Sequence, residues 1–226
     1  MEDKEKKIFL VSLVVFFGFC VLFAAQKIKS FDIWWHLKTG EWIWHHKAIP
    51  YVDPFSYTFQ GVKWIDFEWL FQAAIYPIYQ LGGFEGLIIF KIVVILLAFF
   101  ILFFTCRTLD RGKGWLSITL LFIALLVAQG RFMIRPQIIT LLFFALYVYL
   151  LTLYREKRIS TIRIALLLSP LQVLWVNIHG SFLLGIVLVG LYATGIFVPL
   201  ALSHYRDLKP VFQETLENGW TPPHMS

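Results

Sequence analysis

The sequence predicts an all-α, polytopic helical membrane protein, a fold class that follows from its composition, its apolar runs and its basic residues. Of the 226 residues, 59% are hydrophobic and only 15% are charged, whereas a soluble domain has roughly 25% charged residues. Several runs approach the about 20 apolar residues that cross a bilayer as a helix. The net charge of +6 predicts no nucleic-acid partner, because the basic residues lie in short clusters between apolar runs.

About six transmembrane helices are predicted from these runs. They cover residues 8–26, 84–106, 115–130, 138–154, 163–176 and 182–203, with an N-terminal segment 1–7 and a tail 204–226. The first run is longer than the roughly 7–15 apolar residues of a signal peptide, so we interpret it as an uncleaved span. Cys20 and Cys106 lie in or at the end of separate spans, and we expect no disulfide between them.

The basic residues give these spans an orientation. One cluster precedes the first span, and others follow the second, fourth and sixth spans. With a cytosolic N-terminus, all the clusters fall on the cytosolic side, as the positive-inside rule requires. The clusters are Lys4, Lys6 and Lys7; Arg107, Arg111 and Lys113; Arg155, Lys157, Arg158 and Arg163; and Arg206 and Lys209. We therefore predict a multi-pass protein of the cytoplasmic membrane whose first outer loop is residues 27–83.

The first outer loop is predicted to contain two interfacial helices, since connections beyond about 12–15 residues usually carry structure or function. Residues 32–46, DIWWHLKTGEWIWHH, have the period of an amphipathic helix lying flat on the membrane. Its wheel places Asp32 and His36 on one stripe. Residues 66–80 form the second helix, after an extended piece with two prolines, and the following LGG ends it.

Acidic, basic and amide side chains gather on the predicted outer side. Carboxylates can act as general bases, and guanidinium groups match phosphate oxygens. Such a set suits a phosphate-bearing lipid and an acceptor hydroxyl or amine. The structural alternatives are helix caps for the acids, a packed histidine, and arginines that snorkel to the interface. The candidates are Asp32, Asp53 and Glu68 in the first loop, with His36; Arg131 and Arg135 in the second; and Asn177 and His179 in the third.

The segments that carry these residues also resemble a known family. They are the run FDIWWHLKTGEWIWHHKAIPYVDPFSYTFQGVKWIDFEWL, the tripeptide RPQ and the run LWVNIHGSFLLG. This pattern resembles an uncharacterised group of prokaryotic membrane proteins, which looks like the N-terminal module of GT-C-fold glycosyltransferases. That superfamily includes protein O-mannosyltransferases, oligosaccharyltransferases and lipid A aminoarabinose transferases. The resemblance covers about residues 8–203.

The resemblance implies transfer of a sugar from a polyprenyl-phosphate donor to an acceptor at the outer membrane face. Asp32 matches the acid after the first span, which orients or deprotonates the acceptor or binds a divalent metal ion. Asp53 and Glu68 would be second acids. Because members of this family usually have more spans, a partner subunit or a missing C-terminal half is also expected. The expected substrate-binding residues are His36, Arg131, Arg135, Asn177 and His179.

Two other classes of function stay open at this level. A non-catalytic assembly or scaffold subunit fits the short chain. A lipid or solute transporter would carry charged residues inside its spans, and apart from Lys91 the central spans lack them. The sequence therefore favours the glycosyltransferase over the transporter.

Overall fold

The computed structural model describes residues 3–110 and 114–195 of the chain. Within these ranges the regular structure is helical, and the β-type pairing is an isolated antiparallel bridge between Val52 and Lys63. Three helices, Lys4–Ala24, Trp69–Leu109 and Gln137–Arg155, are long and apolar enough to cross a membrane. The prediction of an all-α chain is confirmed for the described residues, and three of the helices have the length and composition of membrane spans. The last part of the predicted sixth span, residues 196–203, and the predicted tail, residues 204–226, lie outside the described residues, as do Arg111 and Lys113.

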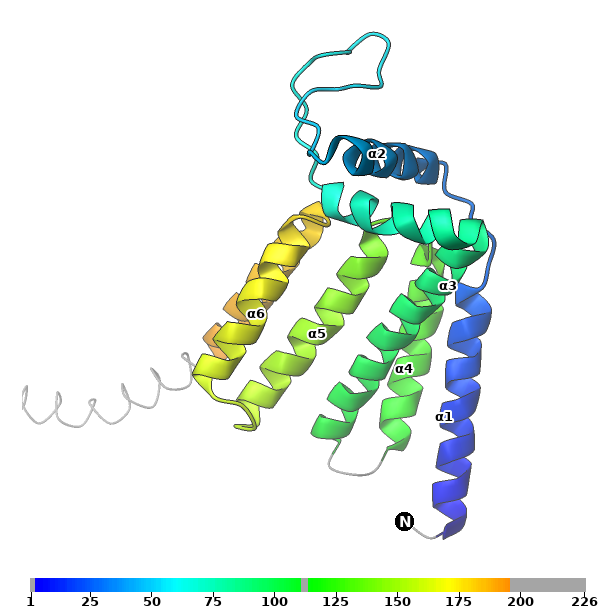
Figure 1. Ribbon diagram of the computed structural model, residues 1–226. Coiled ribbons are helices and arrows are strands. Elements are labelled where there is room, and N and C mark those ends of the chain that lie inside the picture. The colour runs from blue at the N-terminus through cyan, green and yellow to red at the C-terminus, as the bar shows by residue number, and fades with distance from the viewer. Residues whose placement is uncertain (1–2, 111–113, 196–226) are drawn as a thin grey trace, which may run out of the picture. The chain divides into compact units, whose positions relative to one another are not determined.

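The chain divides into two units, residues 1–185 and 186–226. In the second unit, the described residues 186–195 are helical. The first unit holds every element named here (Figure 1). The elements are α1 (Asp3–Ala24), α2 (Asp32–His46), α3 (Trp69–Leu109), α4 (Trp115–Ala128), the 3-10 turn η1 (Gln129–Arg131), α5 (Gln137–Arg155), α6 (Thr161–Val176) and the 3-10 turn η2 (Gly180–Phe182).

Helix α3 is bent, and the bend separates the part of α3 that belongs to the helical bundle from the part that packs against α2. Gly83 has φ 57° and ψ −146°, a conformation that glycine adopts without the clash a Cβ would cause. We call residues 69–82 the cross arm and residues 84–109 the bundle arm. The bundle arm runs beside α1, α4 and α5, whereas the cross arm lies across the end of the bundle beneath α2 (Figure 1). The LGG sequence thus breaks the helix where expected.

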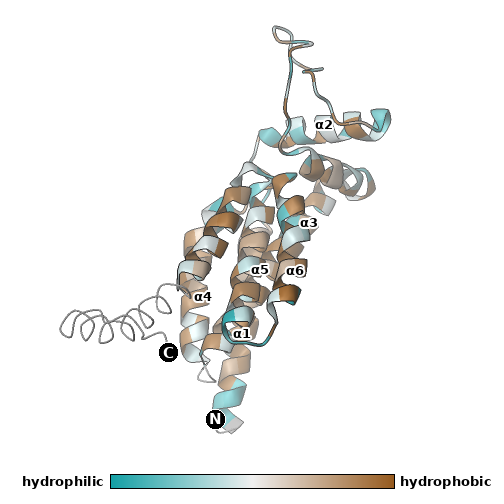
Figure 2. Cartoon of the chain, turned by 90° about the vertical axis from the view of Figure 1, so that its left-hand side faces the viewer, coloured by the Kyte–Doolittle hydropathy of each residue, from teal (hydrophilic) through white to brown (hydrophobic). Residues whose placement is uncertain are grey.

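The bundle is held together by aromatic and aliphatic side chains. Apolar colour dominates its helices, and polar colour is more frequent on α2 and at the helix ends (Figure 2). Lys91 is buried among these apolar groups, and its ammonium donates to the carbonyl of Gln26 at 2.8 Å. The bundle arm therefore also ties down the segment that leads from α1 to α2. The buried core is Phe16, Cys20, Ala24, Ile95, Phe99, Phe103, Leu121, Leu125 and Phe132.

Helix α2 covers Asp32–His46, the range predicted from its periodicity, and it packs on the cross arm. Its apolar residues Ile33 and Leu37 are buried against Phe71 and Ile75 of that arm. At the C-terminal end of α2, the indole of Trp44 donates to the carbonyl of Ala73 at 2.8 Å. The apolar face of α2 therefore packs on protein, and an interfacial position for α2 stays a prediction.

Candidate functional site

Four segments of the first unit meet at the α2 end of the bundle. They are the start of α2, residues 64–72 at the start of the cross arm, the turn after η1, and the turn after α6. Helix packing brings these segments together although they are far apart in the chain. Five of the candidate residues meet here, namely Asp32, His36, Glu68, Arg135 and His179.

Asp32 and Arg135 form an ion pair at one side of this site. The guanidinium Nη2 lies 2.7 Å from Asp32 Oδ2, and Nε donates to the hydroxyl of Ser30 at 2.9 Å. Asp32 is the first residue of α2, where a negative charge is also favoured by the helix dipole. Ser30 is buried. The arginine is therefore held in place by two partners, and its side chain is about 38% exposed.

Glu68 lies between two histidines. Its Oε2 is 3.8 Å from His36 Nδ1, and its Oε1 is 3.8 Å from His179 Nε2. Burial, with the negative charges of Asp66 and Asp32, raises the pKa of Glu68 above its ordinary value. Burial lowers the pKa of His36 to about 4 and lowers that of His179. Near neutral pH both imidazoles are therefore uncharged, and Glu68 has no cationic partner in direct contact among the described residues.

The position of the proton on His179 follows from its hydrogen bonds. The backbone N–H of Ser181 donates to Nδ1 at 3.2 Å, and the hydroxyl of Thr140 lies 3.2 Å from the same atom. The indole of Trp175 donates to that hydroxyl, which leaves the Thr140 proton free to point at Nδ1. Because Nδ1 accepts, a neutral ring carries its proton on Nε2. That N–H points toward the Glu68 carboxylate.

Two cavities and a groove surround these groups. The Arg135 cavity has a volume of about 200 Å³ and is lined by Asp32, Trp35, His36, Glu68, Arg135 and Gln137. The Gln72 cavity has a volume of about 360 Å³ and is lined by Trp35, Trp64, Asp66, Glu68, Gln72 and His179, among others. Trp35 and Glu68 line both. The Lys27 groove, about 730 Å³, is mainly apolar and is lined by Lys27, Lys29, Ser30, Trp34, Phe84 and Ile88, among others.

Three candidate residues lie outside the two cavities. The Asp53 carboxylate accepts backbone hydrogen bonds from Phe55 and Ser56 in its own loop, and hydrogen bonds from these residues lower its pKa. Arg131 is exposed and lines a different, apolar pocket beside α5. Asn177 has partners for its side chain and its carbonyl, since Oδ1 accepts from Trp69 Nε1, Nδ2 donates to Val173, and the carbonyl accepts from Leu70. Asp53 and Asn177 therefore have local hydrogen-bond partners, and Arg131 lies away from the two cavities.

Several residues of the site were not selected from the sequence. Gln72 is 1% exposed, and an isolated glutamine in an apolar helix is the signal that was available for it. The predicted second helix starts at residue 66, whereas the observed helix begins at Trp69. The Oδ1 atom of Asp66 accepts from Glu68 N and Gln72 Nε2. Burial raises the pKa of Asp66. Trp35 and Trp64 line the Gln72 cavity, and no sequence signal singled them out.

A divalent metal ion at Asp32 does not fit these residues. The guanidinium of Arg135 occupies the cationic position next to the carboxylate. In the ranges that the structure describes, no group of three or more His, Cys, Asp or Glu side chains has a metal-binding arrangement.

No family model, curated protein or solved structure matches the chain. The chemistry must therefore be argued from the site itself. That site combines a fixed guanidinium, a half-buried carboxylate without a cationic partner, and two neutral imidazoles. Such a set can bind an anion and accept a proton in the same cavity.

Proposed function

We propose that this protein is a GT-C-like membrane glycosyltransferase, or part of one, that uses a polyprenyl-phosphate-linked sugar at the outer face of the cytoplasmic membrane. The proposal includes six spans, with a cytosolic N-terminus and α2 on the outer side. The observation that carries it is the small cavity in which the Arg135 guanidinium faces the same space as Glu68. A cation beside an available base is what displacement of a phosphate leaving group requires.

The geometry favours Glu68 as the general base in place of Asp32. The Asp32 carboxylate is occupied by Arg135 at 2.7 Å, and its proposed role is to position that guanidinium. Glu68 has a raised pKa, and a base is most effective when its pKa approaches the working pH. The neutral N–H of His179 can orient one of its oxygens. Asp32 is thus a positioning residue, while Glu68 and Arg135 would touch the substrates.

The proposed step balances with these two groups. Glu68 takes the proton of the acceptor hydroxyl or amine as the acceptor atom bonds to the anomeric carbon. The bond between that carbon and the phosphate oxygen breaks, and its electron pair leaves with the polyprenyl phosphate. Arg135 stabilises the charge that develops on this oxygen.

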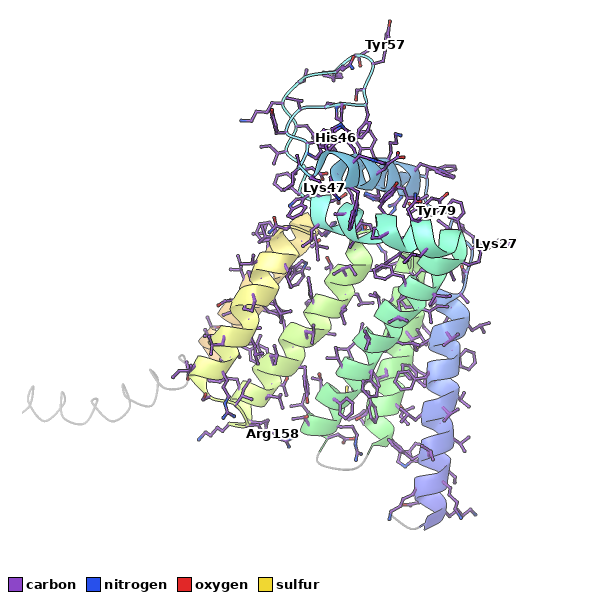
Figure 3. The ribbon with its side chains drawn as sticks, viewed as in Figure 1. Lys27, His46, Lys47, Tyr57, Tyr79 and Arg158 are labelled. Atoms are coloured by element: carbon purple, nitrogen blue, oxygen red, sulfur yellow. The ribbon has the colours of Figure 1, made fainter. Side chains whose placement is uncertain are left out.

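The Lys27 groove supports a lipid on the donor side of this reaction. Its lining is mainly apolar, with Phe84 and Ile88 on the bundle arm, and the positive charges of Lys27 and Lys29 outnumber the one negative charge of Glu85. Ser30 lines the groove and also accepts from Arg135, so the groove adjoins the Arg135 cavity. Lys27 lies close to the bend of α3 (Figure 3). An apolar tail in the groove would leave its phosphate near Arg135.

Native mass spectrometry with added undecaprenyl phosphate tests this proposal. Wild type should retain the lipid, and Arg135→Ala should retain at least about tenfold less, the loss expected when a charge-assisted contact is removed. Arg131→Ala is the matched control, because Arg131 lies four residues before Arg135 in the same connection and outside the cavity. Equal lipid retention by the two arginine variants, or none by wild type, would overturn the proposal.

A second variant separates binding from chemistry. Glu68→Gln keeps the shape of the side chain but removes the base, so it should retain the lipid and lose transfer of sugar from it. Circular dichroism confirms that each variant is folded. Transfer at the wild-type rate by Glu68→Gln would remove Glu68 from the mechanism.

A further inference from the structure

The Gln72 cavity contains buried hydrogen-bond acceptors that have no partner. Gln72 is 1% exposed, its Nε2 donates to Asp66 Oδ1, and its Oε1 has no hydrogen-bond partner. Asp66 Oδ2 is likewise buried without a partner. Buried polar atoms are nearly always hydrogen-bonded in folded proteins. Two such acceptors in the lining of one cavity indicate that a donor-bearing ligand belongs there.

The rest of the lining narrows the chemistry of that ligand. Trp35 and Trp64 form one wall, with ring centroids 5.5 Å apart and planes at 66°. Aromatic faces offer apolar contact, whereas acceptors such as Gln72 Oε1 need hydroxyl or amide donors. No Lys or Arg lines this cavity, while Asp66 and Glu68 do. An anionic ligand is therefore disfavoured, and a neutral ligand with both hydroxyl groups and an apolar C–H face fits.

We infer that the Gln72 cavity binds a monosaccharide unit, or another neutral polyol of that size. The ring stacks on Trp35 and Trp64. The free oxygens Gln72 Oε1 and Asp66 Oδ2 are enclosed in the structure, and rotation of these two side chains brings them to the hydroxyls of the ligand. A volume of about 360 Å³ lies within the range of small-molecule sites. Binding of the polyol stands on these contacts alone, whereas its role as a reacting sugar rests on the proposed function.

The shared residues place this ligand beside the proposed chemistry. Glu68 and Trp35 line both the Gln72 cavity and the Arg135 cavity. A sugar hydroxyl in the first cavity would lie next to the carboxylate that faces the guanidinium in the second. The two cavities thus divide the substrates by charge, with the neutral unit on the tryptophan side and the phosphate on the arginine side.

Saturation-transfer difference NMR tests the inference on the full chain in lipid nanodiscs. The probes are D-glucose, D-galactose and D-mannose, each titrated separately. At least one should receive saturation from the wild type, and its affinity should fall about tenfold in Gln72→Leu, which removes the orphaned acceptor at similar volume. Trp64→Ala, in the loop before the cross arm, should weaken the same sugar without disturbing the buried core.

The matched control is Gln129→Leu, because Gln129 lies in η1, outside the Gln72 cavity, and its amide donates to the carbonyl of Leu126. Equal affinity for the sugar in Gln72→Leu and Gln129→Leu would overturn the inference. So would a wild type that retains undecaprenyl phosphate but binds none of the three sugars, an outcome that leaves the proposed function intact. Sugar binding that depends on Gln72, without any retention of the lipid, would support the inference and refute the proposed function.

Discussion

Substitution of Gly40 tests whether the contact between α2 and the cross arm sets the geometry of the site. A Cβ at Gly40 would lie 2.3 Å from the carbonyl oxygen of Gln72 and 2.8 Å from Tyr76 Cβ. Ordinary contacts between heavy atoms are roughly 3.5 Å. The first obstacle is backbone, so it cannot rotate away. In Gly40→Ala, α2 must therefore move from the cross arm by about 1 Å.

The size of the effect follows from two opposing terms. Overpacking a well-packed contact costs about 1–3 kcal/mol, whereas Gly→Ala inside a helix gains about 1 kcal/mol. We expect a net loss of up to about 2 kcal/mol, which for a chain of this length lowers the Tm by up to about 8 °C. Because α2 carries His36 and the cross arm follows Glu68, a shift of about 1 Å should also reduce activity by about a hundredfold.

Gly18→Ala is the control for this experiment. Gly18 is also inside a helix, α1, but a Cβ there meets nothing within 4 Å. That variant should be unchanged or stabilised by up to about 1 kcal/mol. Thermal unfolding in detergent, followed by circular dichroism, measures both. If Gly40→Ala melts at the same temperature as Gly18→Ala, the close contact does not hold α2 and the reasoning fails.

Two further predictions concern charge and orientation. His36 has a pKa of about 4 in the folded chain against 6.5 when exposed, so only the unfolded chain gains its proton between these values. The free energy of unfolding should therefore fall by about 2 kcal/mol from pH 7 to pH 5. Urea titrations at several pH values measure it, and His36→Gln should lose this dependence on pH. An unchanged dependence in the variant would assign the effect to other groups. Tyr57 and Arg158 lie at opposite ends of the first unit (Figure 3). A membrane-impermeant maleimide added to intact cells should therefore label Tyr57→Cys and not Arg158→Cys. The reverse labelling pattern would invert the proposed topology.

Local sequence signals predicted the helices well because they act within a few residues. The range of α2 follows from its apolar period, and the break in α3 follows from the LGG sequence at Gly83. The start of the cross arm was predicted three residues early, since an aspartate before a helix normally caps it. Here Asp66 instead accepts from Glu68 N and Gln72 Nε2. A carboxylate with several possible partners leaves a helix boundary undetermined in sequence.

The partners within the site could not be predicted from sequence, because they depend on how helices pack. The alternation of spans put Asp32 and Arg135 on one side, but only packing brings them to 2.7 Å. Asp53 was a candidate on the same grounds, and the structure gives its carboxylate to the backbone of its own loop. The charge pattern of the sequence thus predicts the side of the molecule on which the site residues lie. The interatomic distances in the structure are needed to identify which of those residues contact one another.

Asn177 illustrates how a residue selected for binding instead determines the site's dimensions. Its Oδ1 accepts from Trp69 Nε1 at 2.9 Å, and its carbonyl accepts from Leu70 N at 3.1 Å. These bonds tie the end of α6 to the first residues of the cross arm. His179 lies two residues after Asn177 and Glu68 one residue before Trp69, so these bonds join the backbone on the two sides of the 3.8 Å separation of His179 Nε2 and Glu68 Oε1. If Glu68 is the base, the effect of Asn177 on catalysis is transmitted through that distance, without any contact between the amide and the substrate.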